Sequence, residues 1–372
     1  MTLVFEKRLT RSRWVPVVVP IVSLILALLF GGLLLTIFGI NPLKAYRVMA
    51  RGSLGDGYAI SETLVKAIPL MLTGLGISIA FRMLFWNIGA EGQLAIGGIA
   101  ASYVALFLSD SLPAPLVLPL MALFAVLAGA TWGGIPALLK AFIGVNEILT
   151  TLMMNYIAIL LVEYLYLGPW RDPAGYGFPG SAPFPESAWL PRLTGRVHAG
   201  LIFALLAAVL IWFILNHTRW GYEIRVIGEN PRAARYTGVS IARNVLLVML
   251  LSGGLAGLAG MAEVAGLTRR LYGLTVGYGY TAIIVAWLAS LNPWGVILVA
   301  FLMAALLVGG DQIQIALQTP AAVALVLQGA ILFFVLGGSI FVNYRVKVIR
   351  PEQGAAQLPE LDSSVRSGGS HE

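Results

Sequence analysis

The chain has 372 residues, of which 59% are hydrophobic and 11% charged, and its mean hydropathy is +0.87. A soluble domain carries about 25% charged residues, so this composition excludes an ordinary soluble protein and indicates a polytopic membrane protein. The net charge of +7 does not favour nucleic-acid binding, because the basic residues cluster beside apolar segments, as orientation signals do. The absence of cysteine excludes a disulfide framework, a thiolate metal site and a cysteine nucleophile.

Long apolar runs predict an all-α membrane bundle of about ten segments. The predicted segments are 15–38, 62–82, 87–108, 116–139, 148–168, 198–217, 244–265, 278–291, 295–309 and 321–342. The first run has no small-x-small cleavage site, so we interpret it as an uncleaved span. Segments 278–291 and 295–309 are short, and we expect broken or re-entrant helices there.

The basic residues predict the orientation of the bundle. With both termini in the cytoplasm, most of the 24 lysines and arginines lie on the inner side, although Lys44, Arg47 and Arg51 lie outside and weaken the asymmetry. The chain then divides into a cytoplasmic segment 1–14, a transmembrane domain 15–342 and a largely disordered cytoplasmic tail 343–372. Residues 168–197 lie outside and are rich in proline, glycine and aromatics. They predict either a structured cap on which a partner rests or an interfacial anchor built on Trp170 and Trp189.

Polar residues at membrane depth are candidates for a solute path, because exposing them to lipid is costly. Glu91 has two interpretations, a bundle-facing polar network or a simple helix cap favoured by the helix dipole. The candidates start two of the predicted spans or lie within them, and they are Asn87, Glu91, Gln93, Asn146, Glu147 and Asn155.

Glycine patterns add two predictions about packing. Gly253, Gly254, Gly257 and Gly260 leave one face of a helix nearly bare, which favours close packing on a neighbour. The Gly-rich run 277–286 loosely resembles the run 89–97, and a pseudo-twofold repeat would place the substrate between the two runs.

A polar and basic island, residues 221–238, predicts a short docking helix. Asn230 can cap it, Pro231 suits its first position, and Gly238 can supply the left-handed residue that ends it. So short a helix needs a surface to pack against, in its own bundle or in a partner, and we expect Ala233 and Ala234 to face that partner. The alternative is an ordinary basic loop.

Four ordered motifs carry a family resemblance. They are Phe81-Arg-Met-Leu-Phe-Trp-Asn-Ile-Gly-Ala-Glu-Gly-Gln93, Val145-Asn-Glu-Ile-Leu-Thr-Thr-Leu-Met-Met-Asn-Tyr156, Gly228-Glu-Asn-Pro-Arg-Ala-Ala-Arg-Tyr-Thr-Gly238 and Leu251-Ser-Gly-Gly-Leu-Ala-Gly-Leu-Ala-Gly260. Together they resemble the inner-membrane permeases of bacterial ABC importers in the branched-chain amino acid and simple-sugar permease superfamily. The second motif favours the nucleoside-type permeases. Trp86 and Met83 depart from the smaller residues common at those positions.

The resemblance implies a non-enzymatic permease subunit, without a cofactor or metal of its own, in a bacterial inner membrane. It also implies three partners: an ATP-binding-cassette ATPase that uses the ATP, a second related permease chain or a second copy, and an extracytoplasmic binding protein or lipoprotein. The sequence contains no Gly-x-x-x-x-Gly-Lys-Ser/Thr run, which agrees with a separate ATPase. The docking helix would then couple the two subunits, through Glu229, Asn230, Pro231, Arg232, Ala233, Ala234, Arg235 and Gly238.

Two other functions remain open on the residues alone. An ion-coupled secondary transporter would also have about ten spans and buried carboxylates, and a simple-sugar permease would share the motifs. A membrane-embedded enzyme is disfavoured, because His198, His217 and His371 are scattered and no hydrolase or metalloprotease spacing occurs.

Overall fold

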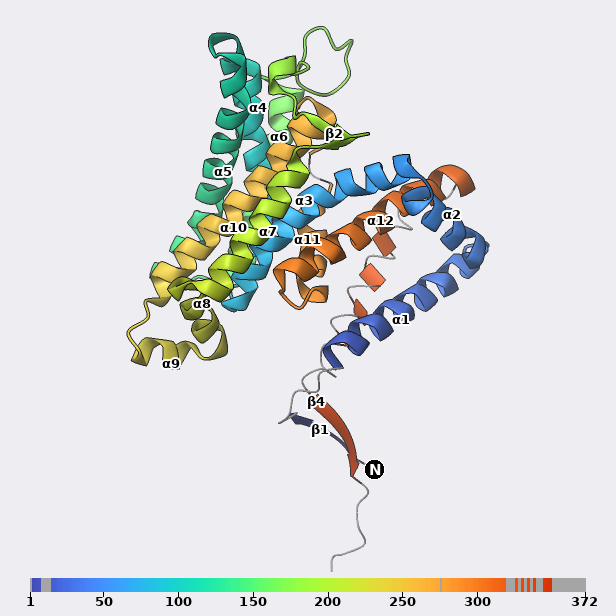
Figure 1. The fold of residues 1–372 in the computed structure, drawn as a ribbon, viewed down its shortest axis with the longest axis vertical. Helices are drawn as coiled ribbons and strands as arrows, with labels where there is room; N and C mark the ends of the chain where they lie inside the picture. Colours follow the sequence, from blue (N-terminus) through green and yellow to red (C-terminus); the bar gives the residue numbers. More distant parts are fainter. Residues whose placement is uncertain are drawn as a thin grey trace, which may run out of the picture.

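The computed structural model describes residues 2–7, 15–274, 276–318, 325–326, 329–330, 333–334, 337–338 and 344–349. These residues form an all-α bundle, as predicted (Figure 1). Its helices are α1 (Val15–Ile37), α2 (Pro42–Leu54), α3 (Gly57–Arg82), α4 (Ala90–Tyr103), α5 (Ala114–Leu138), α6 (Glu147–Leu167), α7 (Gly200–His217), α8 (Arg219–Glu229), α9 (Pro231–Tyr236), α10 (Ile241–Glu263), α11 (Tyr278–Leu288) and α12 (Pro293–Leu317). Single π-helical turns, Val104–Leu108, Leu139–Ile143 and Val264–Thr268, extend α4, α5 and α10.

Seven helices of the described chain are long and apolar enough to cross a membrane, and α1 and α2 form a further pair bent by 119°. α11 has 11 residues and stays well short of a span, as expected for a broken helix. α12 has 25 residues and is a full-length candidate span, longer than the predicted segment 295–309. Most of the predicted segment 321–342 lies outside the described residues.

Two amphipathic helices, α2 and α8, lie between the predicted spans, and the run of apolar segments did not predict them. Asn41 accepts a hydrogen bond from Lys44 N (3.2 Å) to cap α2, and Thr218 accepts one from Gly221 N (3.0 Å) to cap α8. Each helix is too polar for a hydropathy window, yet each buries one face against the bundle. Capping and periodicity therefore form these helices where mean hydropathy gives no signal.

α3 is the central helix of the bundle. Its residues 67–81 are all buried, and it packs against α7, α10, α11 and α12. Close approach depends on glycine, as predicted for α10. A Cβ on Gly257 would lie 2.1 Å from the Ala125 carbonyl oxygen, and one on Gly260 would lie 2.0 Å from that of Leu94. Small residues thus bring α4, α5 and α10 into backbone contact, which is how helices associate tightly in lipid.

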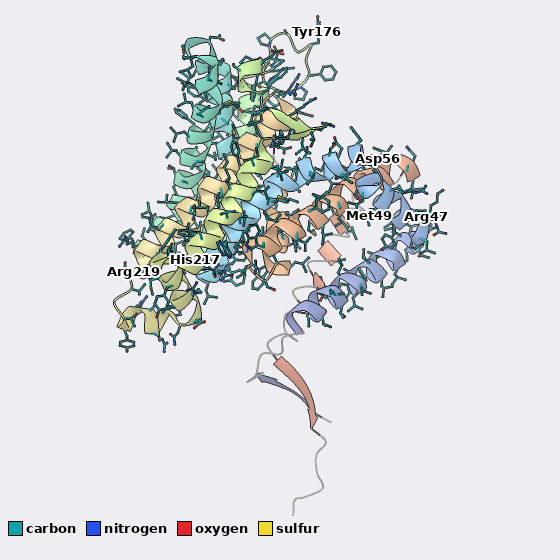
Figure 2. All side chains as sticks on the ribbon, in the orientation of Figure 1. Arg47, Met49, Asp56, Tyr176, His217 and Arg219 are labelled. Carbon is teal, nitrogen blue, oxygen red and sulfur yellow. The ribbon has the colours of Figure 1, made fainter. Side chains whose placement is uncertain are left out.

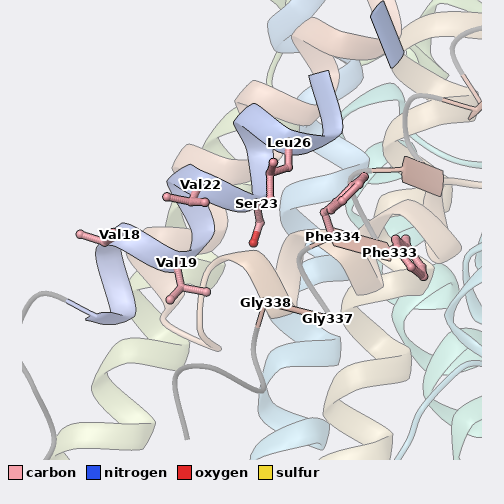
Figure 3. Close-up of a pocket in the computed structure, with 9 residues that line it drawn as sticks. All are labelled: Val18, Val19, Val22, Ser23, Leu26, Phe333, Phe334, Gly337 and Gly338. Carbon is pink, nitrogen blue, oxygen red and sulfur yellow. The ribbon is translucent and has the colours of Figure 1, made fainter. Parts of the chain in front are cut away.

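α1 lies beside the bundle rather than inside it (Figure 1). An apolar pocket separates it from residues 333–334 and 337–338, with Val22 and Leu26 of α1 on one wall and Phe333 and Phe334 on the other (Figure 3). Ser23 is the polar residue in this lining. The ring of Phe30 contacts that of Phe334 at a centroid distance of 5.9 Å. Among the described residues α1 makes few contacts with the bundle, and many of its apolar side chains are exposed.

The bundle has two distinct ends, marked by Tyr176 at one and by His217 and Arg219 at the other (Figure 2). We call the first the cap end and the second the α8 end. At the cap end, residues 168–199 contain a 3-10 turn (Glu186–Ala188) and the antiparallel pair β2 (Arg192–Thr194) and β3 (Val197–His198). Away from the bundle, β1 (Thr2–Lys7) pairs antiparallel with β4 (Tyr344–Ile349), which places the two ends of the described chain together.

The cap is fastened to the bundle by backbone hydrogen bonds. Ser181 N donates to the Leu271 carbonyl (3.2 Å), Phe184 N to that of Arg269 (2.9 Å), and Leu190 N to that of Ala265 (3.1 Å). The guanidinium carbon of Arg269 lies 3.9 Å from the centre of the Trp189 ring, at cation–π distance. The predicted structured cap is therefore present in the fold.

Candidate functional site

α4 and α11 both begin inside the bundle, with their amino ends against each other. Residues 83–89, which follow α3, and residues 269–274 and 276–277, which follow the π-helical turn after α10, are non-helical and lead into these two helix starts. A Cβ on Gly279 would lie 2.3 Å from Glu91 N, so the two helix starts touch. α4 then runs toward the cap end and α11 toward the α8 end (Figure 1). These are the two Gly-rich runs whose resemblance suggested a repeat.

Glu91 serves the amino end of the other helix. Its Oε1 accepts a hydrogen bond from Gly277 N (2.8 Å) and its Oε2 from Gly279 N (2.5 Å), and the residue is 1% exposed. The first N–H groups of a helix have no partner within it, and the helix dipole favours a negative charge there. The carboxylate therefore caps α11, whose N-cap residue, Gly277, lies 186 residues later in the sequence. Both interpretations of Glu91 hold, because it is a helix cap and also a member of a buried polar network.

The amino end of α4 is satisfied by Asn155 of α6. Asn155 Oδ1 accepts from Gly92 N (2.8 Å), and its Nδ2 donates to the Ile88 carbonyl (2.9 Å) and to the Tyr280 hydroxyl (3.2 Å). One amide side chain thus joins α6, the start of α4 and the first turn of α11. In a membrane every buried backbone group needs such a partner, because no water is available to replace it.

A second set of polar contacts lies beside the first. Asn87 Nδ2 donates to Gln93 Oε1 (3.1 Å) and to Ser252 Oγ (3.0 Å), and Gln93 Nε2 donates back to Asn87 Oδ1 (3.0 Å). These three side chains are at most 1% exposed. We call the whole set the polar junction; its members are Asn87, Glu91, Gln93, Asn155, Ser252 and Tyr280.

The structure brings together four of the six residues predicted for a solute path: Asn87, Glu91, Gln93 and Asn155. The other two lie at the α8 end of α6, where Asn146 Oδ1 caps the helix by accepting from Ile148 N (2.9 Å) and Glu147 forms an ion pair with Lys140 (2.6 Å). Sequence reasoning missed Ser252 and Tyr280, since neither carries a local signal that it faces the junction. Among the described residues, no group of three histidine, aspartate or glutamate side chains is placed to hold a metal ion.

α9 has the predicted caps. Asn230 Oδ1 accepts from Arg232 N (3.0 Å) and Ala233 N (3.1 Å), and Gly238, with φ +79°, adopts the left-handed conformation. We expected Ala233 and Ala234 both to face a partner, and this is wrong for Ala234. Ala234 is fully buried in its own chain, because α9 packs against α8 and α10, while Ala233 stays exposed.

The outward surface of α9 is basic and aromatic. Arg232 and Arg235 are exposed, and the Tyr236 side chain is 91% exposed. Glu229, which ends α8, and Pro231, which starts α9, are exposed as well. The short helix is therefore held by its own bundle on one side and presents large side chains on the other.

Two ionisable groups lie in and beside the cap. Burial lowers the pKa of His198 in β3 to about 4, because desolvation penalises the charged imidazole. Arg196 lies 2.9 Å from Glu62 of α3 in an ion pair, and a hydrogen bond to the Tyr58 hydroxyl contributes most to the raised pKa of its guanidinium. These contacts tie the cap to the beginning of α3.

Comparison with known proteins identifies the family to which this chain belongs. The family described as branched-chain amino acid transport system / permease component matches residues 59–336, which includes the polar junction and α9. The chain belongs to this permease family. It is 38% identical to a glucose ABC transporter permease protein of Haloferax volcanii over 95% of both chains. It is 36% identical to a guanosine ABC transporter permease protein of Bacillus subtilis, over 85% of this chain and 92% of that one.

A third relative, a nucleoside ABC transporter permease protein of Lactococcus lactis, is 30% identical over 92% of this chain and 96% of its own length. The resemblance inferred from the four motifs is thus confirmed. The protein is a multi-pass membrane permease of the ABC transporter type, and its relatives serve nucleosides and sugars.

Proposed function

We propose that this permease is one half of the membrane channel of an ABC importer in the bacterial cytoplasmic membrane and that its solute is a nucleoside. The position of Asn155 supports a nucleoside as the solute. It belongs to the sequence run 145–156 that favours nucleoside-type permeases, and it joins α6, α4 and α11 at the polar junction. Discontinuous helices that meet in mid-membrane are where transporters commonly bind their solutes.

The proposal includes three partners and an orientation. An ATPase subunit supplies the energy, a second related permease chain or a second copy completes the channel, and an extracytoplasmic binding protein or lipoprotein delivers the solute. Both termini and the α8 end face the cytoplasm, and the cap end faces outside. The three exposed basic residues of α2 lie on the outer side in this orientation, but the loops of the α8 end hold more.

In this arrangement α9 is the coupling helix. Its buried side, with Ala234, fixes it to α8 and α10, and its exposed side, with Tyr236 and Arg232, contacts the ATPase. Motion of the ATPase would then reach α10 directly through α9, and α10 carries Ser252 of the polar junction. Packed helices transmit such displacements because they are rigid and closely fitted.

A simple sugar is the second candidate solute, favoured by the identity to the glucose permease protein of Haloferax volcanii. The test is uptake into proteoliposomes that hold this permease with its ATPase, second permease and binding protein. We expect ATP-dependent uptake of guanosine and other nucleosides, not inhibited by excess glucose. Uptake of glucose alone would establish the sugar alternative. Uptake that persists without ATP and collapses with an uncoupler would replace the proposal by ion-coupled transport.

A further inference from the structure

Five partly exposed aromatic side chains lie on α6, on α11 and on the non-helical segments that lead into α4 and α11. At the cap end the rings of Tyr166 and Tyr272 meet edge to face at a centroid distance of 5.8 Å. In the middle, Tyr280 is 37% exposed and its hydroxyl is held by Asn155. At the α8 end, Trp287 stacks on Trp86 at 5.7 Å with an interplanar angle of 28°. We call these five residues the aromatic track.

Helix geometry sets the spacing of these residues along the two helices. Asn155 and Tyr166 are eleven residues apart, about three turns, so they lie on one side of α6, about 16 Å apart along its axis. Tyr280 and Trp287 are seven residues apart, about two turns, and share one side of α11 over about 10 Å. Because α6 carries the track toward the cap end and α11 toward the α8 end, the two parts laid end to end reach about 26 Å, close to the ~30 Å of a hydrocarbon core.

The polar groups of the track argue against a lipid-facing surface. The Tyr280 hydroxyl lies at the middle of the track, far from either interface where tyrosines usually serve as anchors. Glu163 is half-buried on α6 and lies three residues before Tyr166, so the two side chains are neighbours on the helix surface. A carboxylate on a span belongs to the bundle interior or a water-filled path, because lipid exposure is costly.

We propose that the aromatic track is one wall of the solute path, that the second permease supplies the opposite wall, and that the track selects solutes with a ring face. This inference rests on the proposed function and specifies its chemistry. A nucleobase or a sugar ring can stack on the aromatic faces, while Glu163 binds its polar edge. Several weak stacking positions in series let a solute enter and leave, as conduction requires.

The first test compares substitutions in the reconstituted transporter. Base–aromatic stacking contributes about 1–3 kcal/mol per base, so loss of one ring corresponds to a change of about fivefold or more. We expect Tyr280→Leu to lower the maximal guanosine uptake at least about fivefold, with ATPase retention unchanged, and Tyr280→Phe to keep most of the uptake. Phe213→Leu, at a 50% exposed aromatic position on α7, is the matched control and should transport normally.

The second test uses the absence of native cysteine. Tyr280→Cys and Ile283→Cys, both on the exposed side of α11, should react with a water-soluble thiol reagent in the assembled transporter, and guanosine should protect them. Leu206→Cys, on a 61% exposed apolar position of α7, should not react. Wild-type uptake by Tyr280→Leu, an equal loss in Phe213→Leu, or absence of labelling at positions 280 and 283 would overturn the track. A wild-type complex that labels as expected but imports no nucleoside would instead refute the proposed function.

Discussion

Replacing Glu91 with leucine should destabilise the bundle, because one side chain is the hydrogen-bond acceptor for two buried backbone N–H groups. The change leaves Gly277 N and Gly279 N without the acceptor that they have at 2.8 and 2.5 Å. A buried unsatisfied N–H costs about 1–3 kcal/mol, so the two together should cost about 2–6 kcal/mol. Glu91→Gln keeps one acceptor oxygen and turns an NH₂ donor toward the other N–H, so about half of that loss should remain.

The measurement is unfolding in mixed micelles by increasing denaturing detergent, followed by tryptophan fluorescence and combined with uptake. Glu147→Leu is the control, because it removes the same group from an ion pair at the α8 end whose other member, Lys140, is 39% exposed. We expect a stability order of wild type and Glu147→Leu, then Glu91→Gln, then Glu91→Leu. If Glu91→Leu unfolds at the wild-type midpoint, Glu91 does not cap α11.

The remaining predictions concern the two ends of the bundle. For orientation, Glu229→Cys should be modified only by reagents that reach the cytoplasm and Gly180→Cys from outside; the reverse pattern would invert the topology. For coupling, Tyr236→Ala should leave the permease folded but reduce retention of the ATPase. Ala234→Asp should instead destabilise the permease itself, because Ala234 is buried within its own chain. Normal coupled transport by both variants would remove α9 from the coupling role. For pH, His198 has a folded pKa of about 4, below its ordinary value of 6.5, so the neutral imidazole stabilises the cap above pH 6.5. The free energy of unfolding should fall by up to about 3 kcal/mol as the pH drops from 6.5 to 4, and His198→Phe should abolish this pH dependence in unfolding measurements.

The sequence predicts well what depends on local composition. The apolar run 148–168 became α6 (Glu147–Leu167), and the caps expected from Asn230 and Gly238 are present in α9. Hydropathy is sufficient for a span because each lipid-facing position must be apolar on its own. It fails for α2 and α8, whose mean hydropathy is low although one face of each is buried.

The polar junction shows what a local pattern cannot provide. Glu91, Asn87 and Asn155 are recognisable because polar residues in apolar runs are rare. The partners of Glu91 are not recognisable, since Gly277 and Gly279 offer backbone N–H groups that every residue has. Likewise, whether Ala234 faces a partner or its own bundle depends on how α9 leans on α8 and α10, which is a tertiary question. The sequence therefore indicates which residues matter at the junction, and the structure supplies what they bind.

The cap that Glu91 provides has a consequence for how the chain is made. Glu91 leaves the ribosome 186 residues before Gly277, a delay of roughly 10 to 40 s at ordinary rates of synthesis. During that interval the carboxylate has no α11 to hold, and α11 in turn is too short to insert as an independent span. The final third of the protein therefore completes a site that the first third leaves open. A chain that stops before residue 277 leaves the Glu91 carboxylate in the membrane without the N–H groups that it binds.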